Sequence, residues 1–176
     1  FDELLVEAPH DGNWESYGHS IGKNTHLDYL SVNGMCFDDM ISSPRADVEA
    51  FFGGVALNVS IQELRLYNFD FETFGVTAFS IASAVSKLTS LEEFSFGFDE
   101  MAGNRDDEMS RFMIQALARS PRLKKAEFFQ NKFGLSCCTE LASLLQNPNS
   151  LLETLALHDC TYGAGLAILS HALSEN

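Results

Sequence analysis

Residues 91–97 read Leu-Glu-Glu-Phe-Ser-Phe-Gly, with an apolar residue at the first, fourth and sixth positions. Phe94 and Phe96 are two residues apart, so they point to the same face of a short strand, and Leu91 turns inward at the bend before it. The same spacing recurs along the whole chain. It occurs at Phe1/Leu4/Val6, Leu27/Leu30/Val32, Ile61/Leu64/Leu66, Leu91/Phe94/Phe96, Leu123/Ala126/Phe128 and Leu152/Leu155/Leu157. The repetition predicts a series of short strands built to one design.

Between these segments, apolar residues recur with the period of a helix. The stripes are Trp14/Tyr17/Ile21, Val48/Phe51/Phe52/Val55, Ala78/Ile81/Ala82/Val85, Met109/Phe112/Met113/Ala116/Leu117, Leu141/Leu144/Leu145 and Leu166/Leu169/Leu173. Each unit is therefore a strand followed by a helix, and parallel strands joined by right-handed helical crossovers form one sheet. Because a helix is wider than the spacing between strands, helices on one side should bend the stack into an arc with the sheet inside.

The six segments, with Asn131 and Cys160 eight residues after the first apolar position of their repeats, resemble the leucine-rich repeat, specifically its ribonuclease-inhibitor-like class. The resemblance implies an α/β fold, a curved solenoid (horseshoe) with a parallel sheet on the concave face and helices on the convex face. Residues 1–176 then form a single leucine-rich-repeat domain of about six repeats, which start near residues 1, 27, 61, 91, 123 and 152. We expect this domain to be part of a longer solenoid, because stacked repeats normally carry polar caps and neither end shows one.

One position of the repeat departs from the family pattern. The resemblance implies an Asn or Cys there, whose side chain bonds to the backbone of the turn. The other repeats carry Pro9, Met35, Phe69 and Asp99 instead. We therefore expect these side-chain hydrogen bonds to be missing in those four repeats.

Composition excludes several classes of partner. The 176 residues have a formal net charge of −14, which repels phosphate backbones and anionic lipid, so we expect no nucleic acid partner. No run of about 18 apolar residues occurs, so we expect no direct insertion into a membrane. The 4 cysteines form no dense framework and predict a reducing compartment, either the cytoplasm or another intracellular one, organelles included.

No catalytic motif is present. The chain has no phosphate-binding Gly-rich loop, no G-x-S-x-G, no H-E-x-x-H and no C-x-x-C. His158 and Cys160, with Cys137 and Cys138 one repeat earlier, lack the spacing of zinc ligands. We therefore predict a protein that is not an enzyme, with no catalytic residues, no metal and no cofactor.

Residues beside the apolar strand positions should point away from the helices, and parallel strands in register would align them in rows. The rows are Tyr29, Glu63, Glu93, Lys125 and Thr154; then Ser31, Arg65, Ser95, Glu127 and Ala156; then Asn33, Tyr67, Gly97, Phe129 and His158. In the third row Gly97 separates two aromatic residues, and we expect a gap of about 10 Å between them, two strand spacings wide. Such a gap could seat a side chain of a partner, and filling it should leave stability unchanged.

The leading functional prediction is a non-enzymatic protein–protein interaction module that binds a protein partner on its concave face. The acidity of the chain indicates a partner with a basic or mixed surface. The predicted binding residues are Glu63, Arg65, Tyr67, Glu93, Gly97, Glu127, Phe129 and His158. A version of this interpretation makes the chain a subunit of a larger assembly.

The alternative is a regulator of a GTPase. Some members of the family that the chain resembles stimulate GTPases, and Arg65 is the only arginine in the three rows. The basic residues Lys124 and Lys125 are not expected to be free to bind a phosphate. They should pair with Glu92 and Glu93 on the neighbouring strand, because the predicted register places them side by side.

Overall fold

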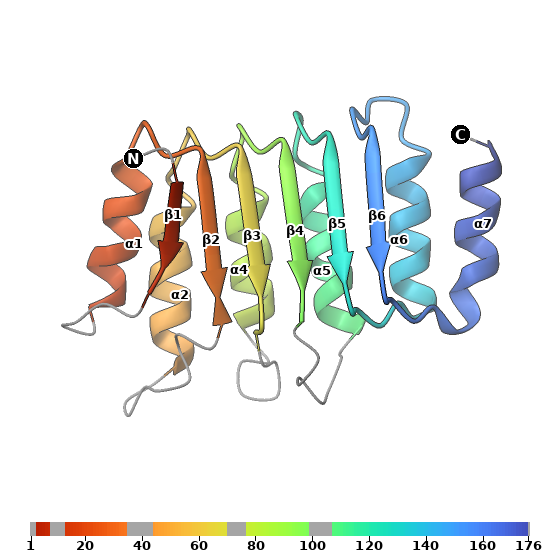
Figure 1. The fold of residues 1–176 in the computed structure, drawn as a ribbon, viewed down its shortest axis with the longest axis horizontal. Helices are drawn as coiled ribbons and strands as arrows, with labels where there is room; N and C mark the ends of the chain where they lie inside the picture. Colours follow the sequence, from red (N-terminus) through yellow and green to blue (C-terminus); the bar gives the residue numbers. More distant parts are fainter. Residues whose placement is uncertain (1–2, 8–12, 35–43, 70–76, 99–106, 176) are drawn as a thin grey trace.

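The computed structural model describes residues 3–7, 13–34, 44–69, 77–98 and 107–175, in which strands and helices alternate along the chain (Figure 1). The strands are β1 (Glu3–Val6), β2 (Tyr29–Asn33), β3 (Glu63–Tyr67), β4 (Glu93–Gly97), β5 (Lys125–Phe129) and β6 (Thr154–His158). The helices are α1 (Trp14–Lys23), α2 (Pro44–Val55), α4 (Thr77–Val85), α5 (Asp107–Leu117), α6 (Leu135–Leu145) and α7 (Leu166–Glu175), with a 3-10 turn η2 (Gly163–Gly165) before the last. The predicted α/β architecture is confirmed.

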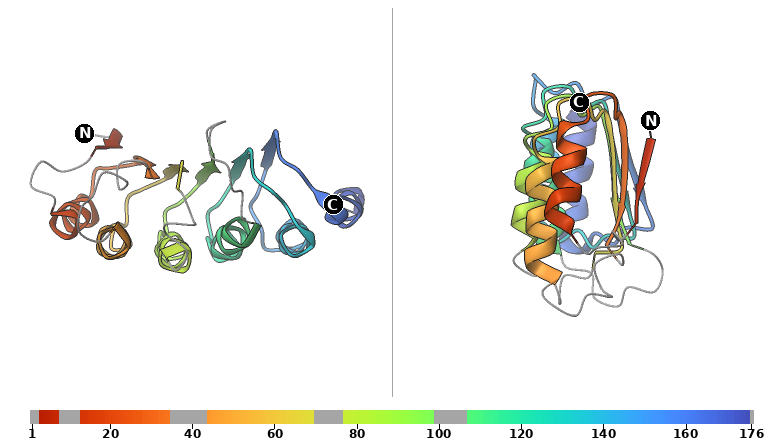
Figure 2. Two further views of the ribbon diagram at one scale, coloured as in Figure 1. Left: turned by 90° about the horizontal axis from the view of Figure 1, so that it is seen from below. Right: turned by 90° about the vertical axis from the view of Figure 1, so that its left-hand side faces the viewer.

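The strands form one 6-stranded parallel sheet in the order in which they occur in the sequence. In the register the middle apolar positions lie side by side, as Leu64 against Phe94 and Phe94 against Ala126 show. The predicted strands and their parallel pairing are therefore confirmed. All of the described helices cover the same face of the sheet (Figure 2). We call the opposite face, which no described helix covers, the open face.

Phenylalanine fills much of the core between the sheet and the helices. Phe94, Phe96 and Phe128 are wholly buried. The ring of Phe128 lies 6.4 Å from that of Phe94 and 5.5 Å from that of Phe133, both in edge-to-face contact. Edge-to-face pairs place the positive rim of one ring on the negative face of the next, which adds to the burial of apolar area. The large number of phenylalanines in the sequence is thus explained mainly by the core.

The apolar stripe predicted for the last helix is only partly correct. Leu169 is buried, but Leu166 and Leu173 are more than half exposed, at 52% and 56%. Ala172, which the predicted stripe left out, is buried instead. The described part of the chain contains no element on the far side of α7, so only the face toward α6 is covered.

The first two helices pack more closely than the others because glycines line their contact. A methyl group built on Gly18 or Gly22 of α1 would overlap the backbone of α2, at Phe51 and Gly54 respectively. A methyl group on Gly54 of α2 would overlap the backbone of Gly18 and His19. The two helices therefore meet backbone to backbone.

Asn131 holds the turn that follows β5. The side chain is wholly buried, and its Nδ2 donates to the carbonyl oxygens of Phe96 at 3.1 Å and Phe129 at 2.9 Å. Its Oδ1 accepts a hydrogen bond of 2.8 Å from Ser110 Oγ. Cys160 occupies the equivalent place after β6, where its thiol lies 3.4 Å from the carbonyl oxygens of Phe128 and His158.

At the corresponding place after β3, Phe69 makes a different contact. It is wholly buried, with its ring 6.0 Å from that of Phe52. Apolar packing thus takes the place of the side-chain hydrogen bonds in this repeat. Pro9, Met35 and Asp99 lie outside the described residues.

We expect Asn131→Ala to lower the free energy of unfolding by about 2 kcal/mol, because it removes the side-chain donor to the Phe96 carbonyl oxygen and the acceptor of the buried Ser110 hydroxyl. Urea unfolding followed by circular dichroism measures this change. Asn149→Ala, which removes an exposed amide, is the control and should shift the value by no more than about 0.5 kcal/mol. Equal values for the two variants would show that the buried amide does not stabilise the turn.

Candidate functional site

The open face carries the predicted rows of side chains. Tyr67 pairs in register with Gly97, Gly97 with Phe129, and Phe129 with His158. The rows through Glu63 and through Arg65 align in the same way. All eight predicted binding residues are thus brought onto one face, over four neighbouring strands.

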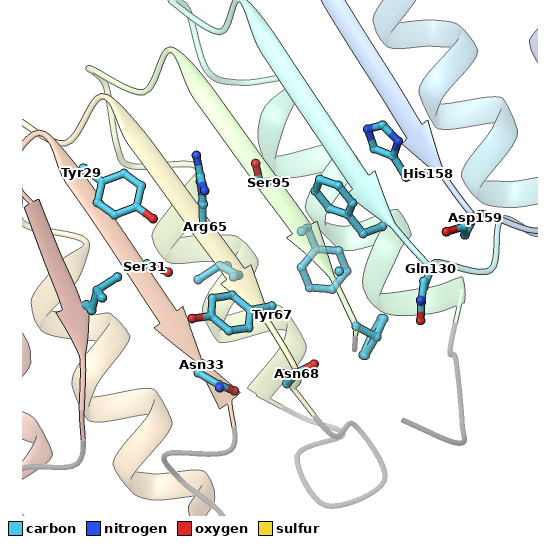
Figure 3. A pocket seen from close by; sticks show the side chains of 16 residues that line it. Tyr29, Ser31, Asn33, Arg65, Tyr67, Asn68, Ser95, Gln130, His158 and Asp159 are labelled. Atoms are coloured by element: carbon cyan, nitrogen blue, oxygen red, sulfur yellow. The ribbon is translucent and has the colours of Figure 1, made fainter. Parts of the chain in front are cut away.

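A groove of about 560 Å³ runs over this face (Figure 3). Tyr29 and Tyr67 form one aromatic wall, His158 lies on the other side, and Ser95 lies between them. Phe129, which pairs in register with His158, belongs to the second wall. Phe129 stacks on His158, with ring centroids 4.8 Å apart and planes 10° from parallel. Tyr67 is 37% exposed, so its ring is available to a partner. The groove is apolar at its walls and has polar groups around them, as is usual for a surface that binds another molecule.

The predicted gap between Tyr67 and Phe129 lies within the groove, but Gly97 itself has no room for a side chain. A methyl group built on Gly97 would lie 2.6 Å from Phe129 Cβ and 2.7 Å from the Phe129 carbonyl oxygen. Strands β4 and β5 therefore approach too closely here for any side chain, and Gly97 is buried. The space available to a partner lies between the Tyr67 ring and the Phe129–His158 stack. Filling position 97 would force the two strands apart, so the prediction that this change leaves stability unchanged is wrong.

Arg65 is held in place by two neighbours. Its guanidinium bonds to Glu63 at 2.7 Å and lies over the ring of Tyr29, 5.2 Å from the centroid. The Arg65 side chain is 48% exposed, so it contributes a charge to the edge of the groove while remaining paired. A cation over an aromatic face adds a further small attraction.

The predicted pairing of the basic cluster is confirmed. Glu92 binds both Lys124 and Arg122 at 2.7 Å. The hydrogen bond from Lys124 is the main cause of a lowered pKa for Glu92; partial desolvation opposes it, and the charges of Lys124 and Arg122 add to it. Lys125 lies 3.7 Å from Glu93 and 3.0 Å from Glu127.

Glu127 is a partly enclosed carboxylate beside the groove, with its side chain 18% exposed. Partial burial alone would raise its pKa, but hydrogen bonds from Lys125 and from Ser95 at 3.1 Å outweigh the burial and hold the pKa below its usual value of 4.5. A carboxylate with a lowered pKa stabilises the folded state above its ordinary pKa, and this contribution is lost as the pH falls through the lowered value.

We therefore expect the difference in the free energy of unfolding between the natural protein and Glu127→Gln to depend on pH. The difference should be present at neutral pH, at up to about 1 kcal/mol because water screens the pair, and should shrink as the pH falls below 4.5. Urea unfolding of both proteins from neutral pH down to about pH 3 measures this change. A constant difference over the whole range would contradict the lowered pKa.

Sequence reasoning missed three residues at the end of the groove. Asn68, Gln130 and Asp159 directly follow β3, β5 and β6, and all three line the groove. Each has a positive φ, of 59°, 54° and 51° respectively. Asn and Asp tolerate this left-handed conformation better than most residues. Asn68 and Asp159 therefore give a weak sequence signal of a turn with positive φ, but Gln130 gives none.

A second, smaller hollow adjoins the groove at the opposite ends of the strands. It has a volume of about 190 Å³ and is lined by Asp28, Tyr29, Gln62, Glu63, Glu92 and Glu93. Tyr29 also lines the groove, so the two hollows are neighbours. Asp28 Oδ1 is buried and accepts no hydrogen bond from the described residues. We call this hollow the acidic pocket.

The described residues contain no group of three or more His, Cys, Asp or Glu side chains that could hold a metal ion. Cys137 and Cys138 are buried, and burial raises the pKa of the Cys138 thiol. Within the same residues, no helix has the length and apolar character needed to cross a membrane.

No protein-family model and no curated protein matches the sequence. Among solved structures, the chain is similar to leiomodin-1 actin-binding site 2, with a TM-score of 0.55 and 14% sequence identity. The match covers 95% of this chain and 91% of the other. At this identity the likeness shows the fold alone.

Proposed function

We propose that the chain is a non-enzymatic protein-interaction module that binds a partner protein on the open face of its sheet. We also propose that it is a leucine-rich-repeat solenoid of the ribonuclease-inhibitor-like class, curved so that the open face is concave. The repeated register of the strands supports this family, as do the side chains of Asn131 and Cys160, which contact backbone carbonyl oxygens after β5 and β6. A reducing intracellular compartment and a place in a larger assembly remain parts of the proposal.

The groove between Tyr67 and the Phe129–His158 stack is the observation that carries the functional proposal. Aromatic side chains that remain exposed in a groove offer a large apolar area at little cost in side-chain entropy, which is why they dominate binding energy in protein interfaces. The ion pairs around the groove hold its charged side chains in defined positions. Charges held in this way contribute more to the choice of partner than to the affinity of binding.

Two other functions have less support. A GTPase regulator would need Arg65 to reach a phosphate, and this side chain is already engaged by Glu63 and Tyr29. An unchanged GTPase turnover rate with Arg65→Ala would reject that role. One solved structure with a similar fold is named for an actin-binding site, but a shared fold does not transfer a partner.

Affinity capture from the native source, followed by calorimetry with the captured protein, tests the proposal. We expect Tyr67→Ala and Phe129→Ala each to raise the Kd by at least about fivefold, because each removes an aromatic anchor. Phe79→Ala is the matched control: this ring is 66% exposed on α4, in the helical layer. A loss of affinity with Phe79→Ala and none with the two groove variants would place the binding surface on the helices instead.

A further inference from the structure

The groove and the acidic pocket together indicate which kind of protein segment the open face binds. This inference rests on the proposed function. The groove supplies an apolar subsite, bounded by Tyr67 and by Phe129 stacked on His158. Flat rings facing an opening of this kind suit an aromatic side chain of the partner, which can pack against both walls.

The acidic pocket supplies a second subsite of defined charge. Carboxylates contribute four of its six lining residues, and no Lys or Arg lines it. The cations that neutralise it approach from outside: Arg65 binds Glu63, whereas Arg122 and Lys124 bind Glu92.

Two carboxylates of the acidic pocket are engaged less closely than Glu63 and Glu92. Glu93 is 3.7 Å from Lys125, which lies nearer to Glu127 at 3.0 Å, and the Glu93 side chain is 47% exposed. Asp28 Oδ1 is buried and accepts no hydrogen bond from the described part of the chain. A cationic side chain entering the pocket would supply donors to the Glu93 carboxylate, and the negative charge of Asp28 would add to the attraction.

The strands set the distance between the two subsites. Glu93 and Gly97 lie at opposite ends of β4, four residues apart, which corresponds to about 13 Å along a strand. Two side chains four residues apart in an extended partner segment point to the same side and are separated by the same distance. We propose that the open face binds an extended segment of a partner protein with an aromatic side chain in the groove and, four residues away, an arginine or lysine in the acidic pocket.

A phage-displayed library of random linear peptides, selected on the whole chain, tests this proposal. We expect the selected peptides to carry an aromatic residue and an arginine or lysine four positions apart. For the peptide that binds best, replacing the cation by glutamine should weaken binding to the natural protein by at least about fivefold in fluorescence anisotropy. The same replacement in the peptide should have little effect on binding to the Glu93→Gln variant, because that variant already lacks the carboxylate that the peptide's cation would bind.

Glu15→Gln is the matched control, since it makes the same change in net charge on the exposed side of α1. If Glu15→Gln weakens the selected peptide as much as Glu93→Gln does, only the overall charge matters and the acidic pocket is not a subsite. Selected peptides that need Tyr67 and Phe129 but carry no cation overturn the inference and leave the proposed function intact. Peptides that bind Tyr67→Ala and Phe129→Ala as well as the natural protein, or no enrichment at all, overturn both.

Discussion

Gly54→Ala should destabilise the protein by about 3 kcal/mol, although the side chain gains only a methyl group. Alanine normally stabilises a helix relative to glycine, by up to about 1 kcal/mol. At this position, however, the methyl group would overlap the backbone of Gly18 and His19, where no side-chain rotation can relieve the contact. Helices α1 and α2 would have to move apart, and the packing around Phe51 would loosen. Urea unfolding measures the change.

The adjacent residue provides an unusually close control. Gly53 belongs to the same helix, is exposed, and has no atom within 4 Å of the place where a methyl group would lie. We expect Gly53→Ala to raise the free energy of unfolding by about 0.5–1 kcal/mol, because only the helix propensity changes. Destabilisation by both variants to the same extent would show that the close approach of α1 and α2 does not exist.

Phe128→Ala should lower the free energy of unfolding by about 3–5 kcal/mol, the largest loss that we expect from a single substitution. The ring is wholly buried against Phe94, Phe96 and Phe133. Its removal leaves a cavity that the neighbouring rings, fixed in edge-to-face contact, cannot close.

Phe129→Ala, one residue later, should cost only about 1 kcal/mol, because that ring faces the groove and packs mainly on His158. The pair of variants tests whether the sheet has one buried and one open face. Urea unfolding of both proteins gives the comparison. Similar losses for the two phenylalanines would mean that both faces of the sheet are covered in solution.

The sequence predicts most of this fold because the same physical requirement recurs in every repeat. Leu64, Phe94 and Phe128 must all face the helices, so their spacing reveals the strands and their register together. The pairing of Lys124 with Glu92 follows from that register without further information. The prediction fails for Leu166 and Leu173 because their burial depends on which element packs beside α7, and a helical period does not contain that information.

The details of the site are harder to predict, because they depend on local distances rather than on a pattern. The prediction that a side chain could fill position 97 assumed evenly spaced strands, whereas β4 and β5 close on each other where the glycine permits it. The place of Gln130 in the groove depends on a positive φ, which this residue type does not indicate. The aromatic identity of the groove was nevertheless predictable, since Tyr67, Phe129 and His158 follow from the row alone.

The most direct test of binding on the open face is hydroxyl-radical footprinting of the chain with and without the captured partner. Oxidation rates of individual side chains report which ones the partner covers. We expect the partner to slow the oxidation of Tyr67 and Phe129 at least about fivefold and to leave Phe79, on the helical layer, unchanged. Protection of Phe79 with unchanged oxidation of Tyr67 and Phe129 would contradict the proposed binding face.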